Sequence, residues 1–148
     1  MKKKFFQMLM MLGTLLFMAS SAAGHCEIPC GIYDDEARMG LLAEHIATME
    51  KSMKTNTDLQ NTQPLNYNQL VRWIMNKENH ADAFQEIVSR YFMTQRIKTD
   101  MNNYNKILTV LHRMLVYAMK CKQTTDLSHI ETLRTLLKEL QTLYFHKH

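Results

Sequence analysis

The sequence predicts an all-α protein, an antiparallel up-down-up-down four-helix bundle over residues 34–148 that follows a short N-terminal segment of a different kind. All four glycines lie at or before position 40, and both prolines lie at or before position 64. From Leu65 to His148 the chain therefore lacks the two residues that most strongly interrupt helices. Apolar residues recur there at spacings of three and four, as on one face of a helix.

The first helix is expected to begin near Asp35, because this residue and its acidic neighbours can cap free N–H groups and oppose the helix dipole. Its apolar face is formed by Met39, Leu42, Ile46, Met49 and Met53. We expect it to end by Lys54, before a polar loop over residues 55–63. Pro64 is expected to open a second, longer helix, whose apolar stripe is formed by Leu70, Ile74, Ala81, Phe84, Val88 and Tyr91.

A polar break over residues 98–103 is expected to separate the second helix from a third. The apolar face of the third helix is formed by Tyr104, Leu108, Leu111, Leu115 and Ala118. Another polar break precedes the fourth helix, whose stripe is formed by Ile130, Leu133, Leu137, Leu140 and Tyr144. Ser128 followed by Glu131 has the spacing of a capping box, although Thr125 or Asp126 can cap instead.

Residues 1–24 have the three parts of a cleavable secretory signal. Lysines occupy positions 2–4, and the apolar stretch over residues 5–18 is too short for a convincing membrane span. Ala22 and Gly24 provide small residues where a signal peptidase reads, so an ordinary signal peptidase is expected to cut after Gly24. The protein is therefore expected to be exported, to the periplasm or outside the cell. An uncleaved N-terminal anchor is the alternative.

Cleavage also changes the charge of the chain. Removal of 24 residues from 148 leaves 124, which is long enough to bury a core without disulfides or a structural metal. The leader contains three lysines and no acidic residue, so the formal net charge falls from +4 to +1. Nothing then argues for a nucleic-acid partner, and no membrane partner is expected after cleavage.

The chain has three cysteines, Cys26, Cys30 and Cys121. An odd number in an exported protein argues against a fold held together by disulfides alone. Cys121 lies near the end of a predicted helix and is expected to be a structural thiol. Cys26 and Cys30 are close enough in sequence to oxidise to each other when metal is absent.

Residues 25–33, which directly follow the predicted cleavage site, read His-Cys-Glu-Ile-Pro-Cys-Gly-Ile-Tyr. With His25 as the new N-terminus, this hook can offer a metal ion an α-amine, an imidazole, the Cys26 amide and the thiols of Cys26 and Cys30. A metal that displaces an amide proton prefers square-planar geometry, which favours Ni(II) or Cu(II) over zinc. Because Cu(II) tends to oxidise such thiols, nickel is the better candidate for this metal-binding hook.

The hook resembles the active-site loop of the nickel superoxide dismutase family, whose mature chains begin His-Cys-x-x-Pro-Cys-Gly-x-Tyr. The match includes every defining position of that motif. The resemblance implies one nickel ion per subunit, held by His25, Cys26 and Cys30. It implies disproportionation of superoxide to oxygen and hydrogen peroxide, with nickel alternating between +2 and +3. It also implies that the bundle assembles as a homohexamer.

The resemblance assigns roles to residues around the metal. The peptide bond before Pro29 is expected to be cis, and Gly31 permits a backbone geometry that is closed to other residues. Tyr33 is expected to lie over the open face of the metal, where it hydrogen-bonds small anions or water. Tyr91, in a Tyr-Phe pair near the end of the second helix, corresponds to a second family tyrosine. Either ring can alternatively serve as a packing aromatic.

One position departs from the family pattern. Well-known members carry an arginine after a Lys-Glu pair on the second helix, where it orients the axial imidazole. His80 occupies that position here, and its charge depends on pH whereas the charge of arginine does not. The family's first-helix carboxylate also has no counterpart, because Gly40 stands in that region and Glu44 lies a turn later. The other histidines are expected to be surface or packing residues: His45, His112, His129, His146 and His148.

Two other classes of function remain open from the residues. The first is a non-catalytic exported bundle that binds nickel or copper through the same hook. The second is a structural or interaction bundle in which Cys26 and Cys30 form a disulfide. A holo-protein without superoxide-dependent activity would support the first, and a thiol count with a metal assay would identify the second.

Overall fold

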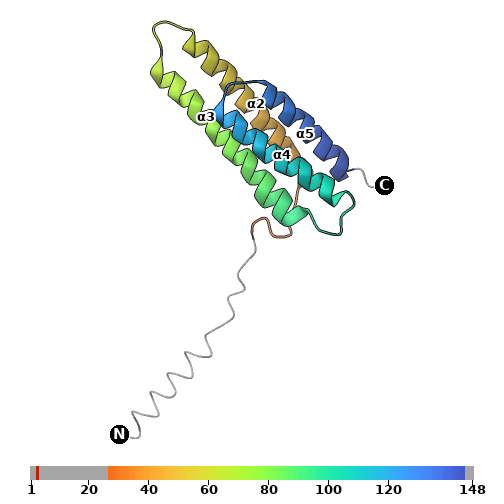
Figure 1. The fold of residues 1–148 in the computed structure, drawn as a ribbon. Coiled ribbons are helices and arrows are strands. Elements are labelled where there is room, and N and C mark those ends of the chain that lie inside the picture. Colours follow the sequence, from red (N-terminus) through yellow and green to blue (C-terminus); the bar gives the residue numbers. More distant parts are fainter. Residues whose placement is uncertain (1–2, 4–26, 146–148) are drawn as a thin grey trace. The chain divides into compact units, whose positions relative to one another are not determined.

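The computed structural model describes Lys3 and residues 27–145, and these residues form helices and turns with no strand among them. The helices, in chain order, are α2 (Asp35–Gln60), α3 (Tyr67–Glu86), the π-helix η1 (Ile87–Arg96), α4 (Tyr104–Gln123) and α5 (Ser128–Phe145). Figure 1 shows α2 and α3 as one long hairpin and α4 and α5 as a second. Because α2 and α4 each pack on both α3 and α5, the predicted four-helix bundle is confirmed. The chain divides into two compact units, one that ends at Ile32 and one that begins at Tyr33.

Helix α2 begins where the sequence predicts and ends later. The Asp34 side chain caps it by accepting a hydrogen bond of 2.9 Å from the Ala37 N–H. The predicted end at Lys54 is wrong, since the helix continues to Gln60. Residues 55–60 include neither glycine nor proline, and the helix propensities of the other residues differ by too little for a polar run to end the helix, even though Asn56 is only 2% exposed.

Helix α3 begins later than predicted and is continued by a different kind of helix. Pro64 does not open it, because Asn66 is the N-cap and its side chain accepts from the Gln69 N–H at 3.1 Å. Beyond Glu86 the chain becomes the π-helix η1, which the apolar pattern does not signal. The predicted end before the polar break is confirmed, since Ile97 is extended.

The start of α5 corrects one detail of the sequence prediction. Ser128 is the first residue of the helix and not its cap. The Asp126 carboxylate accepts from the Ser128 N–H at 2.9 Å, as the alternative reading proposed. The predicted capping box, with Ser128 as the N-cap and Glu131 three residues later, is therefore not formed.

The core contains most of the predicted stripes. All five predicted core residues of α2 are at most 1% exposed. Ile74 is an exception, because it is 38% exposed and lies on an outer face of α3. Cys121 is fully buried, and burial raises the pKa of its thiol to about 11, in keeping with a structural role. None of the helices in the described part of the chain combines the length and apolar character that crossing a membrane needs.

Candidate metal centre

The described part of the hook is a tight turn. The Cys30 N–H donates to the Glu27 carbonyl at 3.1 Å, and the Ile32 N–H donates to the Pro29 carbonyl at 2.9 Å. Gly31 has φ of +90°, a conformation that glycine adopts at little cost. The cis bond between Ile28 and Pro29 and the special geometry of Gly31 confirm both backbone predictions.

The structure describes one of the three predicted metal ligands. Cys30 is exposed in the turn, whereas His25 and Cys26 lie outside the described residues. Among the residues that are described, no group of three His, Cys, Asp or Glu side chains could hold a metal ion. An exposed thiol at a tight turn can serve a soft metal ion, and this part of the predicted donor set is compatible with nickel.

Tyr33, the last residue of the hook, is held on two sides. It is 38% exposed, and the Arg96 guanidinium lies over its ring with 4.2 Å between the guanidinium carbon and the ring centroid. The Tyr91 ring meets it nearly edge-on, with 5.9 Å between centroids and 80° between ring planes. The structure thus places the two tyrosines that were predicted as site residues, Tyr33 and Tyr91, in direct contact although they lie far apart in sequence.

The Asp35 carboxylate organises this cluster. One carboxylate oxygen accepts from Arg96 Nε at 2.8 Å and from the Tyr91 hydroxyl at 2.7 Å. The other oxygen accepts from Arg96 Nη2 at 2.6 Å and from the Tyr144 hydroxyl at 2.8 Å. One side chain at the start of α2 therefore ties together α2, η1 and α5. We call Asp35, Arg96, Tyr91 and Tyr144 the Asp35 cluster.

The electrostatics of the cluster follow from these bonds. Burial alone would raise the pKa of Asp35, but the hydrogen bonds from Arg96, Tyr91 and Tyr144 outweigh it and bring that pKa below its ordinary value of 3.8. Burial, and then the hydrogen bond to Asp35, raise the pKa of Tyr144 to about 12. The same two causes raise the pKa of Tyr91. Both phenols are consequently neutral hydrogen-bond donors at physiological pH.

Tyr91 is a buried member of the site. It is 4% exposed, and its hydroxyl proton is engaged by Asp35. The Arg38 guanidinium lies 5.1 Å from its ring centroid. Tyr91 contacts Tyr33 through its ring, so the buried Tyr91 ring supports the more exposed Tyr33 ring.

His80 has a partner that the sequence did not suggest. Its Nδ1 lies 2.9 Å from Nδ1 of His45, which projects from α2, and both rings are half-buried. Burial first, and then the nearby His80, lower the pKa of His45. One Nδ1 must carry the shared proton and the other must accept it. If His80 accepts while neutral, its proton sits on Nε2, which is then a hydrogen-bond donor directed away from the pair.

Asp35, Arg96 and Tyr144 were not predicted as site residues. Asp35 has the sequence signature of a helix start, and it does perform that role. Its partners lie 61 and 109 residues further along the chain, so no local pattern joins them.

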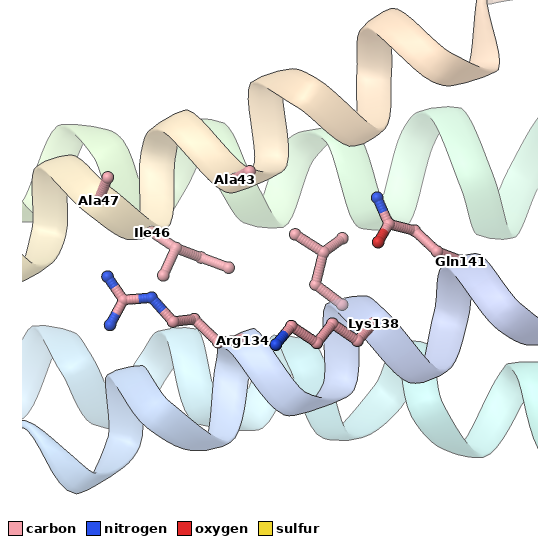
Figure 2. A pocket seen from close by; sticks show the side chains of 7 residues that line it. Ala43, Ile46, Ala47, Arg134, Lys138 and Gln141 are labelled. Carbon is pink, nitrogen blue, oxygen red and sulfur yellow. The ribbon is translucent and has the colours of Figure 1, made fainter.

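A groove between α2 and α5 lies apart from this cluster and shares no residue with it. Figure 2 shows its lining, which encloses about 250 Å³ and is formed by Ala43, Ile46, Ala47, Arg134, Leu137, Lys138 and Gln141. Arg134 is occupied by ion pairs with Glu50 and Glu131. The groove presents apolar surface and cations, and it holds no nucleophile or metal-ligating pair.

The four-helix bundle and the hook with its exposed Cys30 thiol are the features of a helical protein with a candidate metal site near its N-terminus. The family model described as nickel-containing superoxide dismutase matches residues 20–148, and the chain therefore belongs to that family. It is accordingly an oxidoreductase with one nickel ion per subunit and with superoxide as its substrate. Comparison with curated proteins and with solved structures found no match to this chain.

Proposed function

We propose that the enzyme disproportionates superoxide by cycling nickel between +2 and +3, with His25, Cys26 and Cys30 as the ligands. The observation that carries this proposal is the family match, which includes the whole hook, together with the exposed Cys30 thiol in its tight turn. Nickel held by thiolate and amide donors supplies the one-electron exchange that the reaction requires.

The chain's own residues have separate tasks in this proposal. Tyr33 keeps part of its surface open to solvent and orients a small anion or water by hydrogen bonding. Tyr91 donates a hydrogen bond from its hydroxyl to Asp35, and its ring holds the Tyr33 ring in place. Pro29 and Gly31 set the backbone of the hook so that Cys30 faces outward.

His80 is proposed to take the role that the family's arginine has, as a hydrogen-bond donor toward the His25 imidazole. The hydrogen bond between the Nδ1 atoms of His45 and His80 supports this role, because it restrains the His80 ring and leaves its Nε2 free of that bond. We expect His80→Ala to lower turnover while nickel stays bound, and His80→Arg to retain most of the activity. His112→Ala, on an exposed face of α4, is the matched control. Wild-type turnover in His80→Ala would contradict the role.

Maturation and location follow from the leader. We propose that signal peptidase cuts after Gly24, so that His25 gains a free amine and the enzyme works in the periplasm or outside the cell. N-terminal sequencing of the exported protein tests this directly. A mature chain that begins at any other residue would lack the proposed terminal ligand.

Assembly as a homohexamer is proposed on the family resemblance. The structure adds a surface suited to subunit contact, an exposed apolar stripe on α3 formed by Tyr67, Val71, Ile74 and Met75. These residues recur at helical spacing and so share one face. Native mass spectrometry gives the number of subunits.

One experiment tests the function as a whole. The exported protein, supplied with nickel, is analysed by native mass spectrometry, and superoxide decay is followed by stopped-flow. We expect one nickel per subunit and a large acceleration of decay, with both lost in Cys30→Ser and both retained in the matched control Cys121→Ser. Nickel binding without acceleration would favour the non-catalytic metal-binding bundle. A disulfide between Cys26 and Cys30 without metal would favour the structural bundle.

A further inference from the structure

We propose that Asp35 and Arg96 are positioning residues that lock the Tyr33 ring in one orientation, and that the π-helix η1 makes this lock possible. The inference deepens the proposed function, because it concerns how Tyr33 is presented to the reaction. It rests on geometry within the bundle, where all the residues concerned are described.

The first step is the geometry of η1. Tyr91 and Arg96 are five residues apart, which in an α-helix of 3.6 residues per turn would place them about 140° apart around the axis. In η1 the hydrogen bonds join residues five apart, as from the Ile97 N–H to the Phe92 carbonyl at 2.9 Å. The wider turn brings Tyr91 and Arg96 to the same side of the helix. Both then donate to the same oxygen of Asp35, at 2.7 and 2.8 Å.

The second step is the rigidity of the carboxylate. An ionised carboxylate offers about four lone-pair positions, and Asp35 uses four donors, two on each oxygen. Arg96 approaches as a planar fork with one nitrogen on each oxygen, which fixes the plane of the guanidinium. Neither Asp35 nor Arg96 can turn without breaking several bonds at once.

The third step is the transfer of this order to Tyr33. The fixed guanidinium lies over the Tyr33 ring with its carbon 4.2 Å from the centroid, within the range of a cation–π contact. The Tyr91 ring, itself held by Asp35, closes a second side at 5.9 Å. Asp35 thus controls both neighbours of Tyr33 without touching Tyr33 itself.

The positive charge of Arg96 is paired with the negative charge of Asp35. Its Nη2 lies 2.6 Å from an Asp35 oxygen, so the two formal charges cancel at the scale of an approaching anion. Arg96 is therefore inferred to act by orienting a ring and not by attracting superoxide. A positioned group lowers the barrier by holding the reacting geometry in advance, and misplacement by about 1 Å can cost about a hundredfold in rate.

The experiment compares substitutions that separate shape from charge. Arg96→Lys keeps the charge but loses the planar fork, and Arg96→Gln loses both. Arg134 forms ion pairs with Glu50 and Glu131 and lines the groove between α2 and α5, so Arg134→Lys is the matched control. Each nickel-loaded full-length mature enzyme is measured for turnover, for KM and for the ionic-strength dependence of kcat/KM.

A second readout follows Tyr33 directly. The chain has six tyrosines, so labelling with 3-fluorotyrosine gives six ¹⁹F signals, and the signal lost in Tyr33→Phe identifies the residue. We expect the Tyr33 signal to shift and to narrow toward a mobile ring in both Arg96 variants and to stay unchanged in Arg134→Lys. We expect kcat to fall about tenfold in both Arg96 variants, within the range that misplacement can produce. The salt dependence should stay that of the wild type in Arg96→Lys, which keeps a cation beside Asp35.

The outcomes separate this inference from the proposed function. An unchanged Tyr33 signal in Arg96→Lys would overturn the inference, as would wild-type turnover in that variant. A loss of rate confined to Arg96→Gln and strongest at low salt would show attraction of the anion instead, and would also overturn it. If the nickel-loaded wild type has no activity, the proposed function fails, whereas the ¹⁹F arm still decides whether Arg96 orders Tyr33.

Discussion

The Asp35 cluster makes a sharp prediction about stability, which Asp35→Asn tests. Asparagine has nearly the same shape, but it keeps only one acceptor oxygen and carries an NH₂ group at the other position. Because two donors lie on each oxygen of Asp35, two of the four hydrogen bonds are lost whichever way the amide turns. The guanidinium of Arg96 also loses its counter-charge.

The magnitude follows from burial. A hydrogen bond to a charged group contributes about 1.5–3 kcal/mol, and leaving a buried charge without its partner costs about 3–5 kcal/mol. Exposed pairs contribute only about 0–1 kcal/mol. The side chains of Arg96 and Asp35 are 25% and 16% exposed, between these limits. We therefore expect Asp35→Asn to lower the free energy of unfolding by about 2–4 kcal/mol.

Urea unfolding of the mature protein at pH 7 measures this loss as a lower midpoint at constant slope. Tyr144→Phe is the internal comparison, because it removes one hydroxyl and one of the four bonds, and it should cost about 1.5 kcal/mol, the lower limit for a hydrogen bond to a charged group. A loss below about 0.5 kcal/mol in Asp35→Asn would refute the reasoning. Equal losses in the two variants would also refute it, since the charge of Asp35 would then contribute nothing.

Three further predictions follow from the same structure. Folding lowers the pKa of Asp35, so the stability that its carboxylate contributes is present above about pH 4 and is lost as pH falls through the pKa of the folded state. In urea titrations, the difference in unfolding free energy between the wild type and Asp35→Asn should therefore shrink on acidification. Lys77 is 5% exposed and donates to two carbonyls at the end of α4, so Lys77→Met should cost about 1–3 kcal/mol in thermal unfolding, against almost none for the exposed control Lys106→Met. Asp126→Ala should lower the Tm, whereas Ser128→Ala should not, and the reverse result would restore the capping box.

The sequence predicted the helices well where a single face was buried. The α2 stripe from Met39 to Met53 was correct at every position because one face of that helix meets the core throughout. The predicted stripe of α3 was wrong at Ile74, because α3 presents apolar residues on two faces. The end of α2 was misplaced because a polar run without glycine or proline does not end a helix, and the start of α3 was misplaced because Asn66 caps it.

The metal centre divides in the same way. The chain alone determined the fold class and the hook, because adjacent residues form a chelate and the hydrophobic period is local. Tertiary structure decided that Asp35 would collect Arg96, Tyr91 and Tyr144, and that His45 would bond to His80. These contacts join residues far apart in sequence, and the joint approach of Tyr91 and Arg96 to Asp35 also depends on a π-helix whose hydrogen-bond pattern no residue spacing specifies. Candidate ligands that are close together in the chain can be proposed from the sequence, but contacts such as those of Asp35 and His80 cannot.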